Sequence, residues 1–194
     1  RQLVIERQGG SKAARTHLIN VHVVHDREEP RPKVTAGSPQ MKLDPRPLEG
    51  VLDQVVSGGS VANLIGLAVM RHVVAGRTVR TKGMHALGSP LVVYTSLEGH
   101  SCIQKAIELL GFRSDSLRRL PTTADWQMDV DALRKQIAED RRNGLVPACV
   151  AATAGTVNTG AVDALDAIAD LCAAQQLWFH VDAAYGGPGA LLPE

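Results

Sequence analysis

The sequence predicts an α/β protein in which a mainly parallel sheet is covered by helices on both faces, giving three layers. Two observations from residue 51 onward support this fold class: apolar segments of strand length alternate with segments of helical periodicity, and the apolar segments are almost free of polar residues. Strands that are apolar along their whole length are typical of parallel sheets, because helices bury both faces of such sheets. The 194 residues are enough to form a substantial core.

The composition is that of an ordinary globular protein, with 44% hydrophobic and 21% charged residues. The net charge of +1 gives no field that would attract nucleic acid or a membrane, and the aromatic content of 3% argues against a base-stacking surface. No apolar run approaches the ~20 residues that span a bilayer. The cysteines Cys102, Cys149 and Cys172 are widely separated, which favours free thiols in the cytoplasm over disulfides or a zinc site. We therefore expect a cytoplasmic protein that binds a small molecule, without a metal.

Residues 1–50 differ from the rest of the chain and stay unassigned. They are rich in proline and read as loop, apart from one β-like run, HLINVHVVHD, at residues 17–26. Its histidines, His17, His22 and His25, could suggest a metal cluster. Alternation in a strand places His22 and His25 on opposite faces, however, so we interpret the run as an exposed strand that carries histidines.

Regular elements are expected in the following order. The glycine-rich turn SGGS at 57–60 leads into a helix that extends to about residue 76, and LVVYTS at 91–96 is a buried strand. The segment HSCIQKAIELLGF at 100–112 has helical spacing, and Gly111 is placed to end that helix.

The second half continues the alternation. A helix over residues 129–144 begins with Asp129 as N-cap and ends at Asn143-Gly144, and PACVAAT at 147–153 is the next strand. A helix predicted over 163–176, starting at Asp163, connects it to the strand LWFHVD at 177–182.

Polar side chains follow two of these strands. Thr153 and Asp182 stand at strand carboxyl ends, the edge at which ligands bind in open parallel sheets. A buried carboxylate without a partner is costly. Asp182 is therefore expected either at a solvated strand end or beside a cation.

Three further segments carry candidate ligand groups. The free N–H groups at Gly59 and Ser60, at the positive end of a helix, suit a phosphate, although a plain glycine turn with Ser60 as N-cap explains the same residues. His100 opens a helix after a short loop, where an imidazole could stack on a flat ring or transfer protons, or simply face solvent. The loop ATAGTVNTGAVD, which contains Thr156, is by itself an ordinary connection between a strand and a helix.

Together these segments suggest one ligand that carries a phosphate, a flat ring and a cation held against a carboxylate. Pyridoxal phosphate has all three, with its ring nitrogen as the cation.

The order of SGGSVANLIGL, YTSLEGHSCIQKAIELLGF and the segment from MDVDALRKQ to HVDAAYGG resembles the pyridoxal-phosphate-dependent group II amino-acid decarboxylases, which include the aromatic-L-amino-acid, tyrosine and glutamate enzymes. The resemblance covers residues 51–194 and implies the N-terminal part of the large domain of fold type I, the aspartate aminotransferase fold. It also implies a homodimer that converts an L-amino acid into its amine and CO2, with pyridoxal 5'-phosphate as cofactor.

The resemblance implies a role for six residues. Gly59 and Ser60 would hold the phosphate, His100 would stack on the ring, Asp182 would pair with the ring nitrogen and Ala184 would pack beside the ring. His100 and Asp182 would be the catalytic residues of this chain. Thr156 would be a weaker candidate for a contact with the cofactor. The six residues that the resemblance implies as cofactor contacts are Gly59, Ser60, His100, Thr156, Asp182 and Ala184.

The chain also departs from the family pattern. Val61 stands where many members have Glu, and Val157 stands where many have a second Thr after Thr156. The family's Schiff-base lysine follows a histidine downstream of HVDAA, and the chain stops before such a pair, so we expect a fragment that does not turn over alone. The alternatives are another reaction on the same fold, such as transamination, desulfuration or aldol cleavage, and a non-catalytic remnant that binds a partner protomer.

Overall fold

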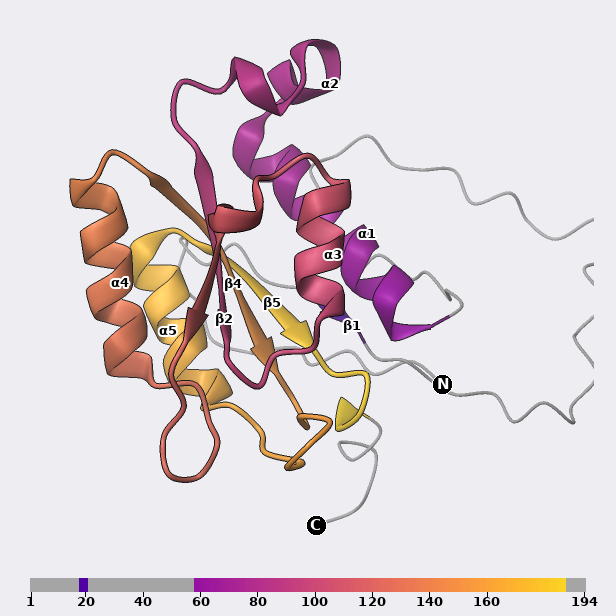
Figure 1. Cartoon of the computed structure of the whole chain (residues 1–194), viewed down its shortest axis with the longest axis vertical. Helices are drawn as coiled ribbons and strands as arrows, with labels where there is room; N and C mark the ends of the chain where they lie inside the picture. Colours follow the sequence, from indigo (N-terminus) through magenta and orange to yellow (C-terminus); the bar gives the residue numbers. More distant parts are fainter. Residues whose placement is uncertain (1–17, 21–57, 188–194) are drawn as a thin grey trace, which may run out of the picture.

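The computed structural model describes residues 18–20 and 58–187, which form one sheet with helices on both sides (Figure 1). The sheet has the strand order β1-β5-β4-β2-β3, and all neighbouring strands run parallel. The strands are β1 (Leu18–Asn20), β2 (Leu91–Ser96), β3 (Leu117–Leu120), β4 (Val146–Thr153) and β5 (Trp178–Asp182). The predicted parallel sheet is confirmed, and β1 lies within the run at 17–26.

Two helices cover each face of the sheet, which confirms the three layers (Figure 1). One face carries α1 (Gly59–Ala75) and α3 (Cys102–Leu109), and the other carries α4 (Val130–Arg142) and α5 (Leu165–Gln175). The short helix α2 (Thr78–Lys82) and the 3₁₀ turns η1 (Met84–Ala86) and η2 (Ser114–Ser116) lie in the connections.

Alternation along β5 decides which side chains face which helices. Phe179 and Val181 belong to the core beneath α4 and α5, whereas Trp178 packs against the core beneath α1 and α3. Because side chains alternate along a strand, His180 and Asp182 share the face of Trp178. The carboxylate of Asp182, at the end of β5, therefore faces α1 and α3.

The helix ends predicted at Asp129, Gly111 and Asn143 are confirmed, and the helix start predicted at Asp163 is wrong. The Asp129 carboxylate accepts hydrogen bonds from the backbone N–H groups of Asp131 and Ala132, both at 2.9 Å, and caps α4. Gly111 follows the last turn of α3 with a φ of 84°, a conformation that favours glycine.

The predicted start of a helix at Asp163 is wrong, because α5 begins at Leu165. The Asp163 carboxylate is buried and accepts hydrogen bonds at 2.7 Å from the N–H groups of Met128 and Thr153. It ties the connection before α4 to the end of β4 instead of capping a helix.

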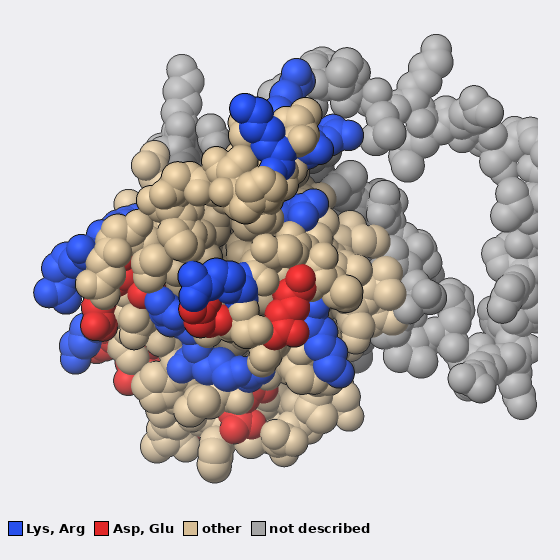
Figure 2. Space-filling model, turned by 45° about the horizontal axis from the view of Figure 1, so that its top comes forward, with Lys and Arg blue, Asp and Glu red and all other residues tan. Residues whose placement is uncertain are grey.

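Charge is mixed on the face of the molecule that Figure 2 shows. Figure 2 shows acidic and basic side chains beside one another, with basic side chains gathered over α2. Within the ranges 18–20 and 58–187, no helix is long and apolar enough to cross a membrane. The same ranges contain no group of three or more His, Cys, Asp or Glu side chains placed to hold a metal ion. His17, His22 and His25 lie outside them.

Candidate functional site

The carboxyl ends of β4 and β5 and the N-terminus of α1 meet at one edge of the sheet. Thr153 and Asp182, predicted to stand at this edge, are register partners. A Cβ atom on Gly59 would lie 2.9 Å from the Cβ of Ala184, so the first residue of α1 touches the segment after β5. The structure therefore brings together three of the predicted residues, Gly59, Asp182 and Ala184.

The loops after β4 and β5 approach each other backbone to backbone. The Gly186 N–H donates to the Ala154 carbonyl at 2.8 Å, and a Cβ on Gly155 would lie 2.9 Å from the Gly186 nitrogen. Gly155 also has a φ of 88°. Both glycines are needed here, because a side chain at either position would separate the loops.

Asp182 is 7% exposed and has few partners. Its Oδ1 accepts a hydrogen bond from the Ala184 N–H at 3.2 Å, and its Oδ2 lies 3.9 Å from the Cys102 Sγ. No Lys, Arg or His of the described ranges forms a salt bridge with it. A carboxylate in this setting favours a cationic ligand, because an ionised group out of water needs a counter-charge.

The N-terminus of α1 suits an anion beside that carboxylate. The N-cap is Gly58, with a φ of 107°, and in the described part of the chain no side chain caps the helix and no acidic residue stands in its first turn. The alternative of Ser60 as N-cap is thus wrong, and the Ser60 side chain is exposed. The positive end of this helix of 17 residues, uncapped by any described side chain, suits a phosphate or carboxylate.

His100 and Thr156 occupy the loops after β2 and β4. His100 is exposed, and its Nδ1 accepts a hydrogen bond from the Cys102 N–H at 3.2 Å, which orients the ring at the start of α3. Thr156 is 1% exposed, and its hydroxyl is 2.6 Å from that of Thr159. The Thr156 hydroxyl therefore already has a partner within its own loop.

Three buried polar residues beneath Asp182 were missed by the sequence reasoning. The Nε2 of His180 lies 2.7 Å from the Oδ1 of Asn63, and the Nδ2 of Asn63 donates to the Cys102 Sγ at 3.3 Å. The one available signal was alternation, which places His180 on the same face as Asp182. Nothing local connects Asn63, Cys102 and His180, since they come from α1, α3 and β5.

Burial controls the protonation of two of these groups. It lowers the pKa of His180 to about 4, against the opposing pull of the Asp182 carboxylate, so the imidazole is neutral near pH 7. Burial raises the pKa of the Cys102 thiol; the hydrogen bond from Asn63 opposes this rise, and the charge of Asp182 adds to it. The thiol therefore keeps its proton and can donate it.

The end of β2 adds two buried hydroxyls at the same edge. Among the residues described, no hydrogen-bond partner is present for the Thr95 Oγ1 or the Ser96 Oγ. Gly99 passes so close to Thr95 that a side chain at this position would collide with the hydroxyl. Buried hydroxyls without partners are unusual in folded proteins.

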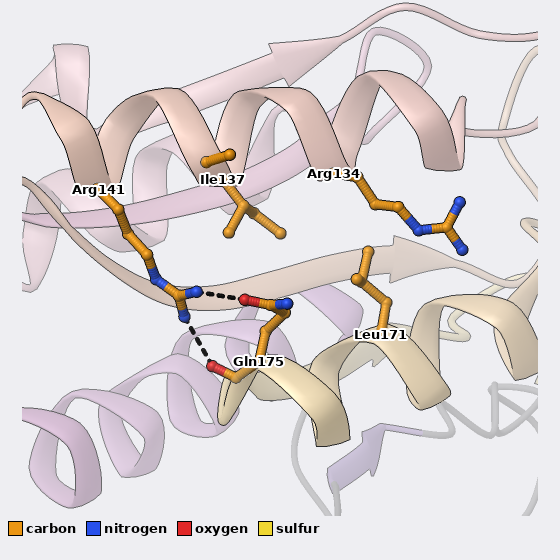
Figure 3. Close-up of a pocket in the computed structure, with 6 residues that line it drawn as sticks. Arg134, Ile137, Arg141, Leu171 and Gln175 are labelled. Carbon is orange, nitrogen blue, oxygen red and sulfur yellow. Dashed lines mark hydrogen bonds between the residues drawn. The ribbon is translucent and has the colours of Figure 1, made fainter.

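A pocket lies elsewhere, between α4 and α5 (Figure 3). Arg141 reaches across it from α4, and its guanidinium donates to the side-chain and backbone oxygens of Gln175 on α5. The pocket contains none of the predicted site residues and is lined by Arg134, Ile137, Ala138, Arg141, Leu171 and Gln175.

Comparison with known proteins connects this geometry to a family. The family profile described as "Pyridoxal-dependent decarboxylase conserved domain" matches residues 38–194. The aromatic-L-amino-acid decarboxylase of Bacillus atrophaeus is 41% identical over 136 residues, which are 70% of this chain and 26% of that protein. The L-2,4-diaminobutyrate decarboxylase of Rhizobium meliloti is 41% identical over 131 residues, covering 68% of this chain and 25% of that protein.

Solved structures agree with the sequence relatives. The crystal structure of mouse CSAD in apo form superposes with a TM-score of 0.65 at 40% identity, over 68% of this chain and 27% of that one. The structure of Oryza sativa TDC with PLP and tryptamine gives a TM-score of 0.63 at 35% identity, over 71% and 28% of the two chains. The chain thus spans about a quarter of the length of these relatives.

The fold is accordingly that of the PLP-dependent decarboxylase structures, seen here over part of their length. The family profile covers well over half of the chain, and the buried carboxylate lies beside an open helix N-terminus. The chain belongs to the pyridoxal-dependent decarboxylase family.

Proposed function

We propose that the intact protein removes the α-carboxylate of an L-amino acid as CO2 and releases the amine, with pyridoxal 5'-phosphate as cofactor. Residues 51–194 are the N-terminal part of its cofactor-binding large domain in this proposal; residues 1–50 are given no role in it, although they include β1 and the family profile begins at residue 38. The observation that carries it is Asp182, a buried carboxylate with no salt bridge in the described ranges, beside the open N-terminus of α1.

The residues at the edge of the sheet fit such a cofactor. Asp182 supplies the counter-charge for a protonated ring nitrogen, and the start of α1 at Gly59 and Ser60 supplies N–H groups and a positive dipole for a phosphate. When bound, pyridoxal phosphate withdraws electrons from Cα as the bond to the carboxylate breaks. Asp182 keeps the proton on the ring nitrogen, which strengthens that withdrawal.

The remaining predicted residues shape the sides of the site. Ala184 is small and lies close to Gly59, so its side chain lets the segment after Asp182 approach the start of α1. The orientation of His100, fixed through its Nδ1, supports its role as the residue that stacks on the ring. The Thr156 hydroxyl is paired with that of Thr159, so Thr156 would support the conformation of its loop rather than offer a free hydroxyl to the cofactor.

A lysine of the intact protein would carry the cofactor. The lysines within the described ranges, Lys82, Lys105 and Lys135, are all exposed, and Lys105 stands on α3 away from the buried side of that helix. We propose that the attaching lysine belongs to another part of the protein.

The substrate class in the proposal is L-amino acids, since relatives of equal identity are named for aromatic amino acids and for L-2,4-diaminobutyrate. A homodimer in the cytoplasm completes the proposal. The location is supported by Cys102, Cys149 and Cys172, all of them buried free thiols.

The test is a product assay on the full-length protein with added pyridoxal phosphate. We expect CO2 and an amine in equal amounts from at least one member of a panel of aromatic, acidic and diamino L-amino acids, and neither product from the Asp182→Ala variant. Formation of a keto acid without CO2 would favour transamination. Failure of the wild-type protein to bind the cofactor would favour a non-catalytic remnant.

A further inference from the structure

A chain of buried hydrogen bonds ends on the carboxylate of Asp182. It runs from His180 on β5 to Asn63 on α1, from Asn63 to Cys102 on α3, and from Cys102 back to the end of β5, with heavy-atom distances of 2.7, 3.3 and 3.9 Å. His180 is 0%, Asn63 1% and Cys102 5% exposed. Water therefore does not compete for these bonds.

The direction of the donors in this chain is consistent. The amide nitrogen of Asn63 donates to Cys102, so its oxygen faces His180, and the imidazole must carry its proton on Nε2. The Cys102 thiol accepts from Asn63 and has its own hydrogen left to donate. The carboxylate of Asp182 can only accept, so it is the natural end of the chain.

We propose that Cys102, held by Asn63 and His180, is a positioning residue that fixes the Oδ2 atom of Asp182 and so orients this carboxylate toward the ring nitrogen of the cofactor. The inference rests on the proposed function, since it concerns the same carboxylate.

Two observations separate this role from that of an ordinary core thiol. Cys102 is the first residue of α3, and besides its contact with Asp182 its backbone N–H donates to His100. It thus contacts both residues predicted to hold the ring. The other oxygen of Asp182 is held by the Ala184 N–H, so loss of the thiol would free one side of the carboxylate to rotate.

The experiment measures the dissociation constant of pyridoxal phosphate by absorbance in the full-length apoprotein. We expect Cys102→Ala to raise the constant about fivefold, as for the loss of one weak hydrogen bond to a charged acceptor. Cys102→Ser, which keeps a donor, should stay within about twofold of the wild type. Cys172→Ala is the matched control, since Cys172 is also buried but lies in α5 on the other face of the sheet, and it should leave the constant unchanged.

A double-mutant cycle supplies the decisive comparison. In an Asp182→Asn background, Cys102→Ala should have no further effect on cofactor affinity, because the group that it positions has lost its charge. Equal losses in both backgrounds, or an unchanged constant for Cys102→Ala, would overturn the positioning role while leaving the proposed function intact. A wild-type protein that binds no cofactor would instead overturn the proposed function, and this inference with it.

Discussion

Two buried aspartates, Asp140 and Asp182, lie on opposite faces of the sheet and have opposite surroundings. Asp140 on α4 is 1% exposed and accepts hydrogen bonds at 2.9 Å from the Arg118 guanidinium and from the Tyr94 hydroxyl. Among the described residues, Asp182, which is 7% exposed, has the Ala184 N–H and the Cys102 thiol as the only hydrogen-bond donors to its carboxylate. Within the ranges that the structure describes, the chain supplies a cation for Asp140 and none for Asp182.

This difference separates a structural from a functional use of the same side chain. A buried carboxylate costs free energy unless a cation and hydrogen bonds compensate it. Arg118 compensates Asp140, and the same hydrogen bond raises the pKa of Arg118. In the proposed function the compensation at Asp182 comes from the cofactor, so the same substitution at the two positions should have different consequences.

Of the substitutions at Asp140 and Asp182, Asp182→Asn should have the larger effect, and this effect should be on cofactor affinity. Loss of the charge leaves the ring nitrogen without its counter-ion, a cost of about 3–5 kcal/mol for a buried pair, which corresponds to an affinity weaker by roughly 10²- to 4 × 10³-fold. The stability of the apoprotein should not fall, since no cation in the described ranges is left unpaired. Cofactor titration and urea unfolding of the apoprotein measure both quantities, and an unchanged affinity would refute the role of Asp182.

His180, on the same face, should make stability depend on pH. Burial lowers the pKa of His180 to about 4 in the folded protein, against 6.5 as the ordinary value. At pH values between these two pKa values, His180 binds a proton in the unfolded chain but not in the folded chain. The contribution of His180 to the free energy of unfolding is therefore fully present above pH 6.5 and is lost as the pH falls toward 4. The loss from this group reaches about 3 kcal/mol.

The control for this pH effect is His180→Gln, which removes the titrating ring and keeps an N–H donor near Asn63. Urea unfolding at a series of pH values from about 7 to about 4.5 should show a shallower fall in stability for the variant. Parallel curves for the two proteins would mean that His180 is accessible to protons in the folded state.

Asp140→Asn should lower stability and leave cofactor affinity unchanged. The variant keeps an oxygen for the Tyr94 hydroxyl but leaves the Arg118 guanidinium, 28% exposed, without its counter-charge. We expect a loss of about 2 kcal/mol, less than for a fully buried pair, because solvent screens part of the interaction. Urea unfolding measures it, and cofactor titration of the same sample provides the contrast with Asp182→Asn.

The fold was predictable because it depends on local patterns. The strand at 91–96 is apolar throughout and was predicted with its observed limits, as were the roles of Asp129 and Gly111 at helix ends. The edge strand β3 was not anticipated, because its sequence LRRL carries two arginines and lacks an apolar pattern. Asp163 resembles a helix cap in sequence, but its partners come from β4 and from the connection before α4.

The candidate site was predictable only in part. Gly59 and Asp182 could be expected at one edge because parallel strands and the helices that follow them present their ends there. The hydrogen bonds beneath Asp182 join residues that are 39, 80 and 117 positions apart in sequence. No local spacing encodes such contacts; they arise when α1 and α3 pack on the same face of the sheet.

Asp129→Ala should have a smaller effect than the substitutions at Asp182, His180 and Asp140, and it should change only the stability of the protein. Its carboxylate satisfies two N–H groups at the start of α4, at 2.9 Å each, and loss of such a cap costs about 1 kcal/mol. Asp131→Ala is the matched control: Asp131 stands in the same first turn but is exposed and pairs only with Arg134 on the surface, so its loss should cost less. Thermal unfolding compares the two variants, and equal shifts would contradict the assignment of Asp129 as the cap. Cofactor affinity should be unchanged in both variants, because α4 and Asp182 lie on opposite faces of the sheet. A change in cofactor affinity would mean that the two faces are coupled.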